Sequence, residues 1–264
     1  MRFSITTDMF NYSFNPSLDE KLALFKKHGF EYIHWCDNWN DDVLYSTGDM
    51  KAHAKAIQDS GLVCLDVHET AAGIYRIDSL NPEGWKGYVK LLENRIKFCH
   101  EVGGDAVVVH PPKVYQPNME KRVHVSKQTL DSVKPLCQEL SVALAIENCS
   151  RKDHMILGDY FQLYEPEFIG WCYDSGHANN HGNLENVKLF GDRLLVIHLH
   201  DNKGVGDDHQ YPGWGTIDWK DISTWLKGLS YDKPLNLEVT HDPNHFTGTM
   251  DEFMEKTMES TRLL

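Results

Sequence analysis

Apolar and polar residues alternate along this chain in blocks that predict strands and amphipathic helices in turn. Short apolar runs are each followed by a longer segment in which apolar residues recur three and four positions apart, as on one face of a helix. The expected strands cover residues 2–7, 30–35, 62–67, 106–109, 142–146, 169–173, 194–197 and 235–237. The expected helices cover residues 17–28, 49–60, 82–102, 121–140, 154–164, 184–190, 218–229 and 249–262.

Strict alternation of strand and helix indicates an α/β protein with a parallel sheet, and eight such units predict closure into a (β/α)₈ TIM barrel. The wholly apolar run 106–109 suits a strand that is buried on both faces. No Gly-rich GxGxxG follows the first strand, which disfavours an open doubly wound sheet. Because no Pro- or Ser-rich linker interrupts the pattern, we expect a single TIM-barrel domain over residues 1–264.

Composition narrows the class of protein. The formal net charge is −13, which disfavours a nucleic-acid partner because such surfaces are normally basic. The six cysteines form no CxxC pair and are expected to be reduced, buried thiols. No apolar run approaches the roughly 20 residues that span a bilayer, and the first residues do not resemble a signal peptide. A cytoplasmic protein without a membrane partner is expected.

Polar residues stand at the carboxyl ends of six successive expected strands, the third to the eighth. They are His68, His110, Glu147, Asp174, His198 and Glu238. In a TIM barrel these ends converge on the face that carries the active site. Burying so many titratable groups together is costly without a cation. Imidazole and carboxylate groups are ligands of Zn²⁺, Mn²⁺, Mg²⁺ or Fe²⁺, so this face is predicted to hold a divalent metal ion.

Five segments together carry a resemblance to a known family. They are IEN at 146–148, YDSGHAN at 173–179, HLHD at 198–201, PGWGTIDW at 212–219 and LEV at 237–239. In this order they resemble the xylose isomerase-like TIM-barrel superfamily. That group contains sugar and sugar phosphate isomerases and epimerases, and also the endonuclease IV type of apurinic-site nuclease.

The resemblance implies a ligand set and a reaction. Glu147, Asp174, His198 and Glu238 would hold one ion, with His198 preferred over His200 because the family's metal histidine stands three residues before an acidic residue, here Asp201. Glu147 and Glu238 would also be the catalytic pair that moves a proton. The implied function is a metal-dependent isomerase or epimerase of a small sugar, sugar phosphate or polyol, working through a metal-stabilised enediolate.

Further residues are expected around the substrate. By the resemblance His177 matches the histidine that contacts the sugar. His200, His68 and His110 stand at or just after strand ends and are further candidates for substrate contact. Trp35 belongs to an aromatic segment, 34–39, that either walls the pocket or packs as a loop. Trp214 stands where the family usually has an acidic residue, and either stacks on a sugar or packs against the barrel rim.

A second function in the same superfamily stays open. Endonuclease IV binds three zinc ions and cuts abasic DNA, and the residues His68, His110, Asp207 and His209 match its additional ligand positions. Against it, the chain is acidic, lacks an Arg- or Lys-rich run and has Pro111 and Pro112 after His110. A metal-dependent dehydratase of a cyclic polyol is a further alternative. The sequence names neither the sugar nor the native ion, and it is compatible with a homo-oligomer.

Overall fold

The structure is a computed structural model and describes residues 1–10, 16–113, 116–182 and 184–264. Its strands are β1 (Phe3–Thr6), β2 (Tyr32–Trp35), β3 (Val63–His68), β4 (Ala106–Val109), β5 (Ala143–Glu147), β6 (Ile169–Asp174), β7 (Leu194–Leu199) and β8 (Leu235–Leu237). Its α-helices are α1 (Leu18–Lys27), α2 (Thr47–Ser60), α3 (Pro82–Glu101), α4 (Met119–Leu140), α5 (Asp153–Leu163), α6 (Ser175–His181), α7 (Leu184–Val187), α8 (Trp219–Lys227) and α9 (Met250–Ser260). Two 3₁₀ helices, η1 (Lys188–Arg193) and η2 (Thr261–Leu263), complete the described elements.

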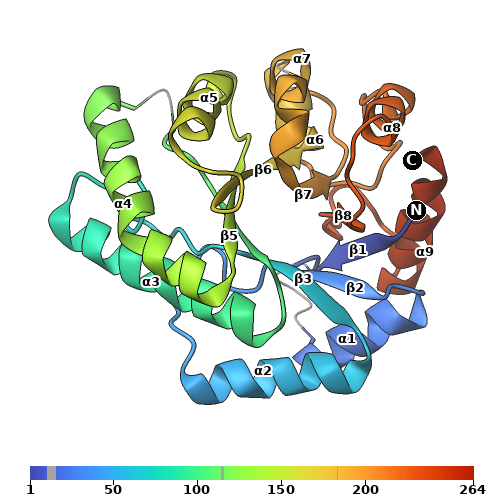
Figure 1. Cartoon of the computed structure of the whole chain (residues 1–264). Helices are drawn as coiled ribbons and strands as arrows, with labels where there is room; N and C mark the ends of the chain where they lie inside the picture. Colours follow the sequence, from blue (N-terminus) through green and yellow to red (C-terminus); the bar gives the residue numbers. More distant parts are fainter. Residues whose placement is uncertain (11–15, 114–115, 183) are drawn as a thin grey trace.

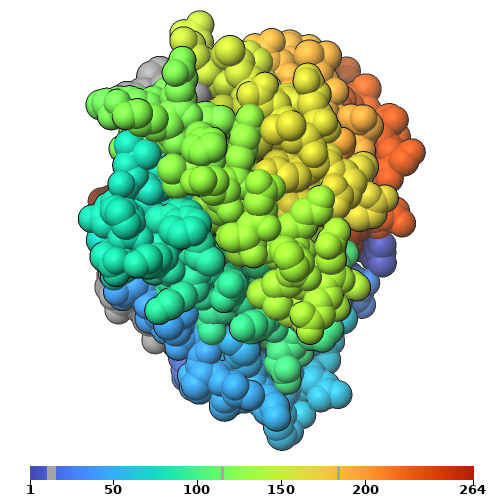
Figure 2. Space-filling model, turned by 60° about the vertical axis from the view of Figure 1, so that its left-hand side comes forward, coloured from blue at the N-terminus to red at the C-terminus, as the bar shows by residue number. Residues whose placement is uncertain are grey.

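The strands form a closed parallel barrel in the order β1 to β8, which confirms the predicted (β/α)₈ fold. The barrel closes where β1 pairs with β8, with Phe3 opposite Leu235. Helices surround the strands, and both chain ends lie on the side of α9 (Figure 1). On one face of the molecule, the segments that contain α2 to α5 lie side by side from blue to yellow (Figure 2).

Each strand sends alternate side chains to opposite sides of the barrel wall. In β4, Val107 and Val109 belong to the large apolar core between strands and helices. Ala106 and Val108 face the other way, in a small apolar cluster with Ala145, Cys172 and Val196. This alternation decides which residues of every strand face the barrel interior, and the site depends on it.

Two strand pairs contain a bulge that changes which residues stand opposite one another. Between β2 and β3, Ile33 pairs with Cys64 but His34 pairs with Asp66. Between β6 and β7, the register shifts at Trp171 and Cys172, so that Asp174 stands opposite His198. Bulges of this kind are frequent beside active sites, where they re-aim a side chain.

The ends of the helices follow the sequence signals. Gly29 and Gly61 have positive φ angles and follow α1 and α2. Asp218 caps the start of α8, since its side chain accepts a hydrogen bond from the Asp221 amide. No helix among the described residues is both long and apolar enough to cross a membrane.

One helix was not predicted, and another has a different form. α6 begins directly at the end of β6, because the Asp174 carboxylate accepts a 2.6 Å hydrogen bond from the His177 amide and caps the helix. No loop separates the strand from this helix, so the two merge in the hydrophobic pattern. The expected helix at 184–190 is the short α7 followed by η1.

Candidate metal centre and active site

The inward side of the strand ends carries the predicted polar residues. Glu147 and Asp174 end β5 and β6, His198 lies in β7, and Glu238 directly follows β8. All four are at most 7% exposed. They alternate with apolar neighbours such as Ile146 that face the helices. The alternation along each strand therefore aims these groups at one point inside the barrel mouth.

Glu147 lies at the centre of the cluster, between imidazoles on two sides. Its Oε2 atom is 3.0 Å from His110 Nε2 and 3.7 Å from His68 Nε2. Its Oε1 atom is 3.2 Å from His198 Nδ1 and 3.6 Å from His177 Nδ1. Burial raises the pKa of Glu147, but attraction to the surrounding imidazoles outweighs burial and holds the pKa well below its ordinary value. A carboxylate placed in this way would be available as a ligand of a divalent ion.

His198 joins the two glutamates. Its Nδ1 atom lies 3.2 Å from Glu147 Oε1 and 3.1 Å from Glu238 Oε2, and the residue has no exposed surface. Asp174 is linked to Glu147 through the His177 ring, since His177 Nδ1 is 3.6 Å from both Asp174 Oδ1 and Glu147 Oε1. The structure thus brings three predicted ligands into contact and places the fourth beside them.

A further group forms around Asp207, in the loop after β7. Asp207 Oδ2 lies 3.2 Å from His177 Nε2 and 3.1 Å from His209 Nε2. Burial lowers the pKa of His209, but the charge of Asp207 outweighs it and raises this pKa to about 10. Asp207, His177 and His209 therefore form a third His–carboxylate group at the same barrel mouth.

These groups fit divalent ions by the chemistry of their donor atoms. His177 Nδ1 is buried beside the Glu147 and Asp174 carboxylates and has no hydrogen-bond partner among the described residues. One ligand atom each from His68, His110 and Glu147 lie within 4.8 Å of one another. Because unpaired buried polar atoms are costly, a bound cation is the simplest way to satisfy such a cluster.

Most members of these groups line a pocket of about 1100 Å³, whereas Asp174 and His198 are not among its described lining residues. Its described wall carries more carboxylates than cationic groups: Asp8, Asp37, Asp41 and Asp242 against Lys21, Arg76 and Lys113. Lys21 is 2.7 Å from Asp37, so these two charges offset each other and leave Asp8, Asp41 and Asp242 against Arg76 and Lys113. The acidic wall disfavours a polyanion and leaves room for a small molecule.

The sequence profile of the family described as xylose isomerase-like TIM barrel matches residues 22–261. The chain belongs to this family. A curated relative, uncharacterized protein y4fM of Sinorhizobium fredii, is 26% identical over 87% of this chain and 83% of its own length. The probable endonuclease 4 of Mycoplasma pneumoniae is 24% identical over 64% of this chain and 66% of its own length.

Solved structures share the fold of this xylose isomerase-like chain. The IOLI protein with a bound zinc atom superposes with a TM-score of 0.78 at 19% identity, covering 99% of this chain and 96% of that one. An L-ribulose 3-epimerase superposes with a TM-score of 0.78 at 18% identity, covering 99% of this chain and 92% of that one.

Three predicted substrate contacts of this family member are placed away from the pocket. Trp35 is 1% exposed and packs against Tyr45 and Phe98 on the helix side of β2. His200 is fully buried, with Nε2 3.1 Å from Asp174 Oδ2. Trp214 packs 5.1 Å from the His245 ring, and neither tryptophan is among the described lining residues. These positions argue against direct contact with a substrate.

The predicted contacts His68, His110 and His177 do line the pocket. Trp39, which belongs to the aromatic segment 34–39 but was not singled out as a substrate contact, lies beside them. Its ring makes edge contacts with His68 at 5.9 Å and with His110 at 6.3 Å between centroids. The segment 34–39 was recognised as aromatic, but β2 ends at Trp35, so the loop position Trp39 supplies the wall of the pocket.

Two carboxylates that are not predicted ligands, those of Asp201 and Glu69, hold neighbouring groups of the site in place by hydrogen bonds. Asp201 accepts hydrogen bonds from the Gly213 amide at 2.9 Å and from Trp219 Nε1 at 2.8 Å, and so anchors the Gly-rich turn. Glu69 is buried, and its Oε1 atom accepts a 2.7 Å hydrogen bond from the His110 amide. The sequence signals could have found Glu69, which directly follows His68 at the end of β3.

The His209–Asp207 pair predicts a pH dependence. Because the folded-state pKa of His209 is raised to about 10, its contribution to stability is fully present below about pH 6.5 and lost as pH rises through the folded value. We expect the chelator-treated protein to lose thermal stability between these limits. Calorimetry at several pH values, with Asp207→Asn as the control, checks this. Equal slopes for wild type and D207N would contradict it.

Proposed function

We propose that this chain is a divalent-metal-dependent isomerase or epimerase of a small sugar, sugar phosphate or related polyol. One observation carries the proposal. Glu147 and Glu238 lie 3.2 and 3.1 Å from the same His198 nitrogen, at the floor of a pocket of about 1100 Å³ with an acidic wall. Two carboxylates that share one site beneath a small-molecule pocket suit the removal and return of a proton.

The residues that would hold the ion are Glu147, Asp174, His198 and Glu238. When bound there, a divalent ion polarises a substrate carbonyl and acidifies the neighbouring C–H bond. His68 and His110 on one side, and Asp207 with His209 on the other, extend the same donor set around the centre. The proposed class of reaction is supported by a relative, an inosose isomerase of Bacillus velezensis that is 22% identical over 94% of this chain and 91% of its own length.

The two glutamates differ in how free they are to take a proton. Both Glu147 oxygens face imidazoles, so this group is engaged on two sides. Glu238 is 7% exposed, lines the pocket and has one imidazole contact under 3.5 Å, His198. We assign the first proton transfer to Glu238, and leave Glu147 to return the proton or to hold the centre together.

Two neighbours are placed to orient the substrate. His177 lines the pocket and lies between Asp174 and Asp207. Burial lowers the pKa of His177, but these carboxylates raise it well above its ordinary value, so it can donate a hydrogen bond to a substrate oxygen. The Trp39 ring offers an apolar face for the C–H bonds of a sugar.

The proposal is tested by exchange with deuterated water. The Mn²⁺-loaded protein is incubated with a panel of aldoses, ketoses, their phosphates and cyclic keto-polyols, and deuterium is located by NMR. We expect exchange at a carbon next to a carbonyl. Glu238→Gln should slow this exchange by about 10²–10⁴-fold, as expected for loss of a general base. Absence of exchange across the whole panel would refute the proposal.

A second candidate is a metal-dependent phosphodiesterase acting on abasic DNA. The observation that favours it is Asp207, which lies within 3.2 Å of both His177 and His209 and so completes a third His–carboxylate group. Cleavage of an abasic oligonucleotide that is lost in D207N, with no deuterium exchange, would establish this function in place of the first. The acidic wall of the pocket weighs against it.

A further inference from the structure

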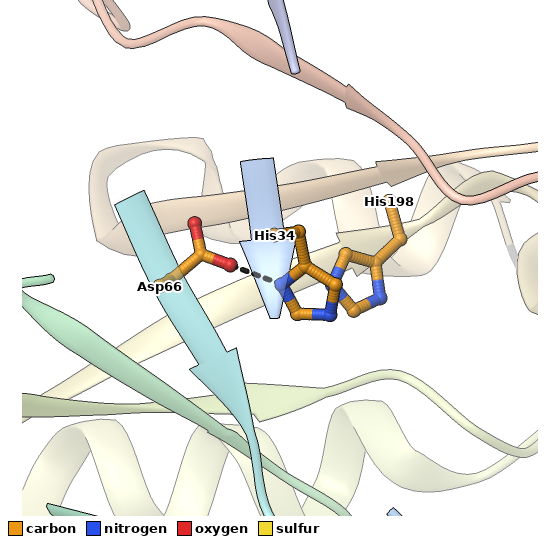
Figure 3. Close-up of side chains that lie close together, drawn as sticks. All are labelled: His34, Asp66 and His198. Atoms are coloured by element: carbon orange, nitrogen blue, oxygen red, sulfur yellow. Dashed lines mark hydrogen bonds and ion pairs between the residues drawn. The ribbon is translucent and has the colours of Figure 1, made fainter. Parts of the chain in front are cut away.

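We propose that Asp66 and His34 form a buried hydrogen-bonded chain that orients the ring of His198 for metal binding. The three side chains lie together inside the barrel, with His34 between the other two (Figure 3). The proposal rests on the metal centre of the proposed function, but assigns a role to two residues beneath it. Both would act through His198 and would not touch the substrate.

The geometry begins with the bulge between β2 and β3. It places His34 opposite Asp66, and the ring nitrogen Nδ1 of His34 contacts the Asp66 carboxylate. Both residues are buried, His34 fully and Asp66 with 4% exposure, and neither is a described lining residue of the pocket. Since an apolar pair would fill this space at lower cost, a buried imidazole and carboxylate point to a role beyond packing.

The hydrogen bond to Asp66 fixes which nitrogen of His34 carries the proton. A carboxylate only accepts, so His34 donates from Nδ1, and its Nε2 is left with a free lone pair. This Nε2 atom is buried and has no hydrogen-bond partner among the described residues. It needs a donor.

His198 offers that donor. Its Nδ1 atom faces Glu147 and Glu238, so a metal-binding His198 carries its proton on Nε2. This Nε2 atom is also buried and lacks a hydrogen-bond partner among the described residues. The His34 and His198 rings lie 4.6 Å apart between centroids, and one ring nitrogen of each lies within 4.8 Å of the other and of an Asp66 oxygen.

A bond from His198 Nε2 to His34 Nε2 would satisfy both nitrogens. Metal-binding histidines usually donate their other ring N–H to such a partner, and loss of that partner typically weakens metal binding about 10–100-fold. Here the partner is itself held by Asp66. The carboxylate–imidazole–imidazole chain would keep the Nδ1 lone pair of His198 aimed at the ion.

The test is metal affinity, measured by Zn²⁺ competition with a chelating dye. His198→Ala first identifies the binding step that depends on His198. His34→Phe should weaken that step about 10–100-fold and leave any other step unchanged. His34→Gln restores an acceptor and should recover part of the loss. His53→Phe is the matched control, because His53 lies outside the barrel wall against Trp35 and should bind zinc as wild type does.

Folding is followed in parallel by thermal unfolding without metal. If H34F does not fold, the comparison of H34Q with Asp66→Leu decides, since D66L removes only the carboxylate that holds His34. Wild-type affinity in H34F, or in D66L, would overturn the inference. Wild-type protein that binds zinc but exchanges no substrate proton would refute the proposed function alone.

Discussion

Replacing Glu147 with glutamine is expected to remove activity and to disrupt metal binding together. Glutamine keeps the shape of the side chain but removes the charge that faces His110 at 3.0 Å and His198 at 3.2 Å. We expect kcat/KM for the exchange reaction to fall by about 10²–10⁴-fold or more, the range for loss of one acid–base group, because a metal ligand is lost as well.

The measurement pairs steady-state kinetics with metal titration of purified E147Q. Glu139→Gln is the matched control, because Glu139 is exposed on α4 and is not among the described residues that line the pocket. It should retain wild-type kinetics and stoichiometry. If E147Q binds the same number of ions with the same affinity, Glu147 is not the central ligand and the site must be assigned again.

Gly176→Ala is expected to disrupt the site through packing. A Cβ atom on Gly176 would lie 1.9 Å from His200 Cε1. His200 cannot easily retreat, because it is stacked 3.9 Å from the His209 ring and its Nε2 lies 3.1 Å from Asp174. In a helix, alanine would otherwise gain about 0.5–1 kcal/mol over glycine, whereas overpacking typically costs about 1–3 kcal/mol. The cost of the clash is therefore expected to exceed the gain in helix propensity.

Denaturant unfolding and metal titration of G176A check this prediction. We expect a net loss of stability and weaker metal binding, since a displaced His200 releases Asp174. Gly158→Ala is the matched control in α5, because its Cβ would meet only Phe190 at 3.9 Å, and it should be neutral or stabilising. Wild-type metal affinity in G176A would mean that the stack of His200 and His209 does not support the centre.

The barrel was predictable because each strand–helix unit has a recognisable hydrophobic pattern within its own stretch of sequence. Parallel strands buried on both faces are continuously apolar, as in β4, and the helices between them are amphipathic. The same rule predicted that polar residues at strand ends would meet, and Glu147, His198 and Glu238 do lie in contact. Closure of the barrel brings the strand ends together, so the same hydrophobic pattern predicts both the fold and the cluster of polar residues.

Trp35 shows where the same reasoning was incomplete. The residue is aromatic and stands at a strand end, but alternation along β2 sends it to the helix side and sends His34 inward. If the alternation of side chains had been applied along the whole strand, His34 would have been predicted to face the barrel interior and Trp35 to face the helices. Alternation along a strand decides which side of the barrel wall a side chain faces, and this matters as much for predicting the site as nearness to the strand end.

Other features depend on geometry that no local pattern shows. The bulge that places His34 opposite Asp66 inserts one residue into β3, and without it the two would not be paired. Likewise, the contact of Asp207 with His177 joins the loop after β7 to α6, a helix that was itself not predicted. Register and loop conformation are set by tertiary packing, so the inner chain, and the contact of His177 with the predicted pair Asp207 and His209, became visible only in the structure.

The claim that the barrel mouth holds a catalytic divalent ion is tested most directly by anomalous diffraction from crystals grown with Zn²⁺ or Mn²⁺. The predicted result is an anomalous peak at about 2.0–2.2 Å from ligand atoms of Glu147, Asp174, His198 and Glu238. Additional peaks beside His68 with His110, and beside Asp207 with His209, would favour the phosphodiesterase candidate. Absence of any peak among the first four residues would contradict the claim.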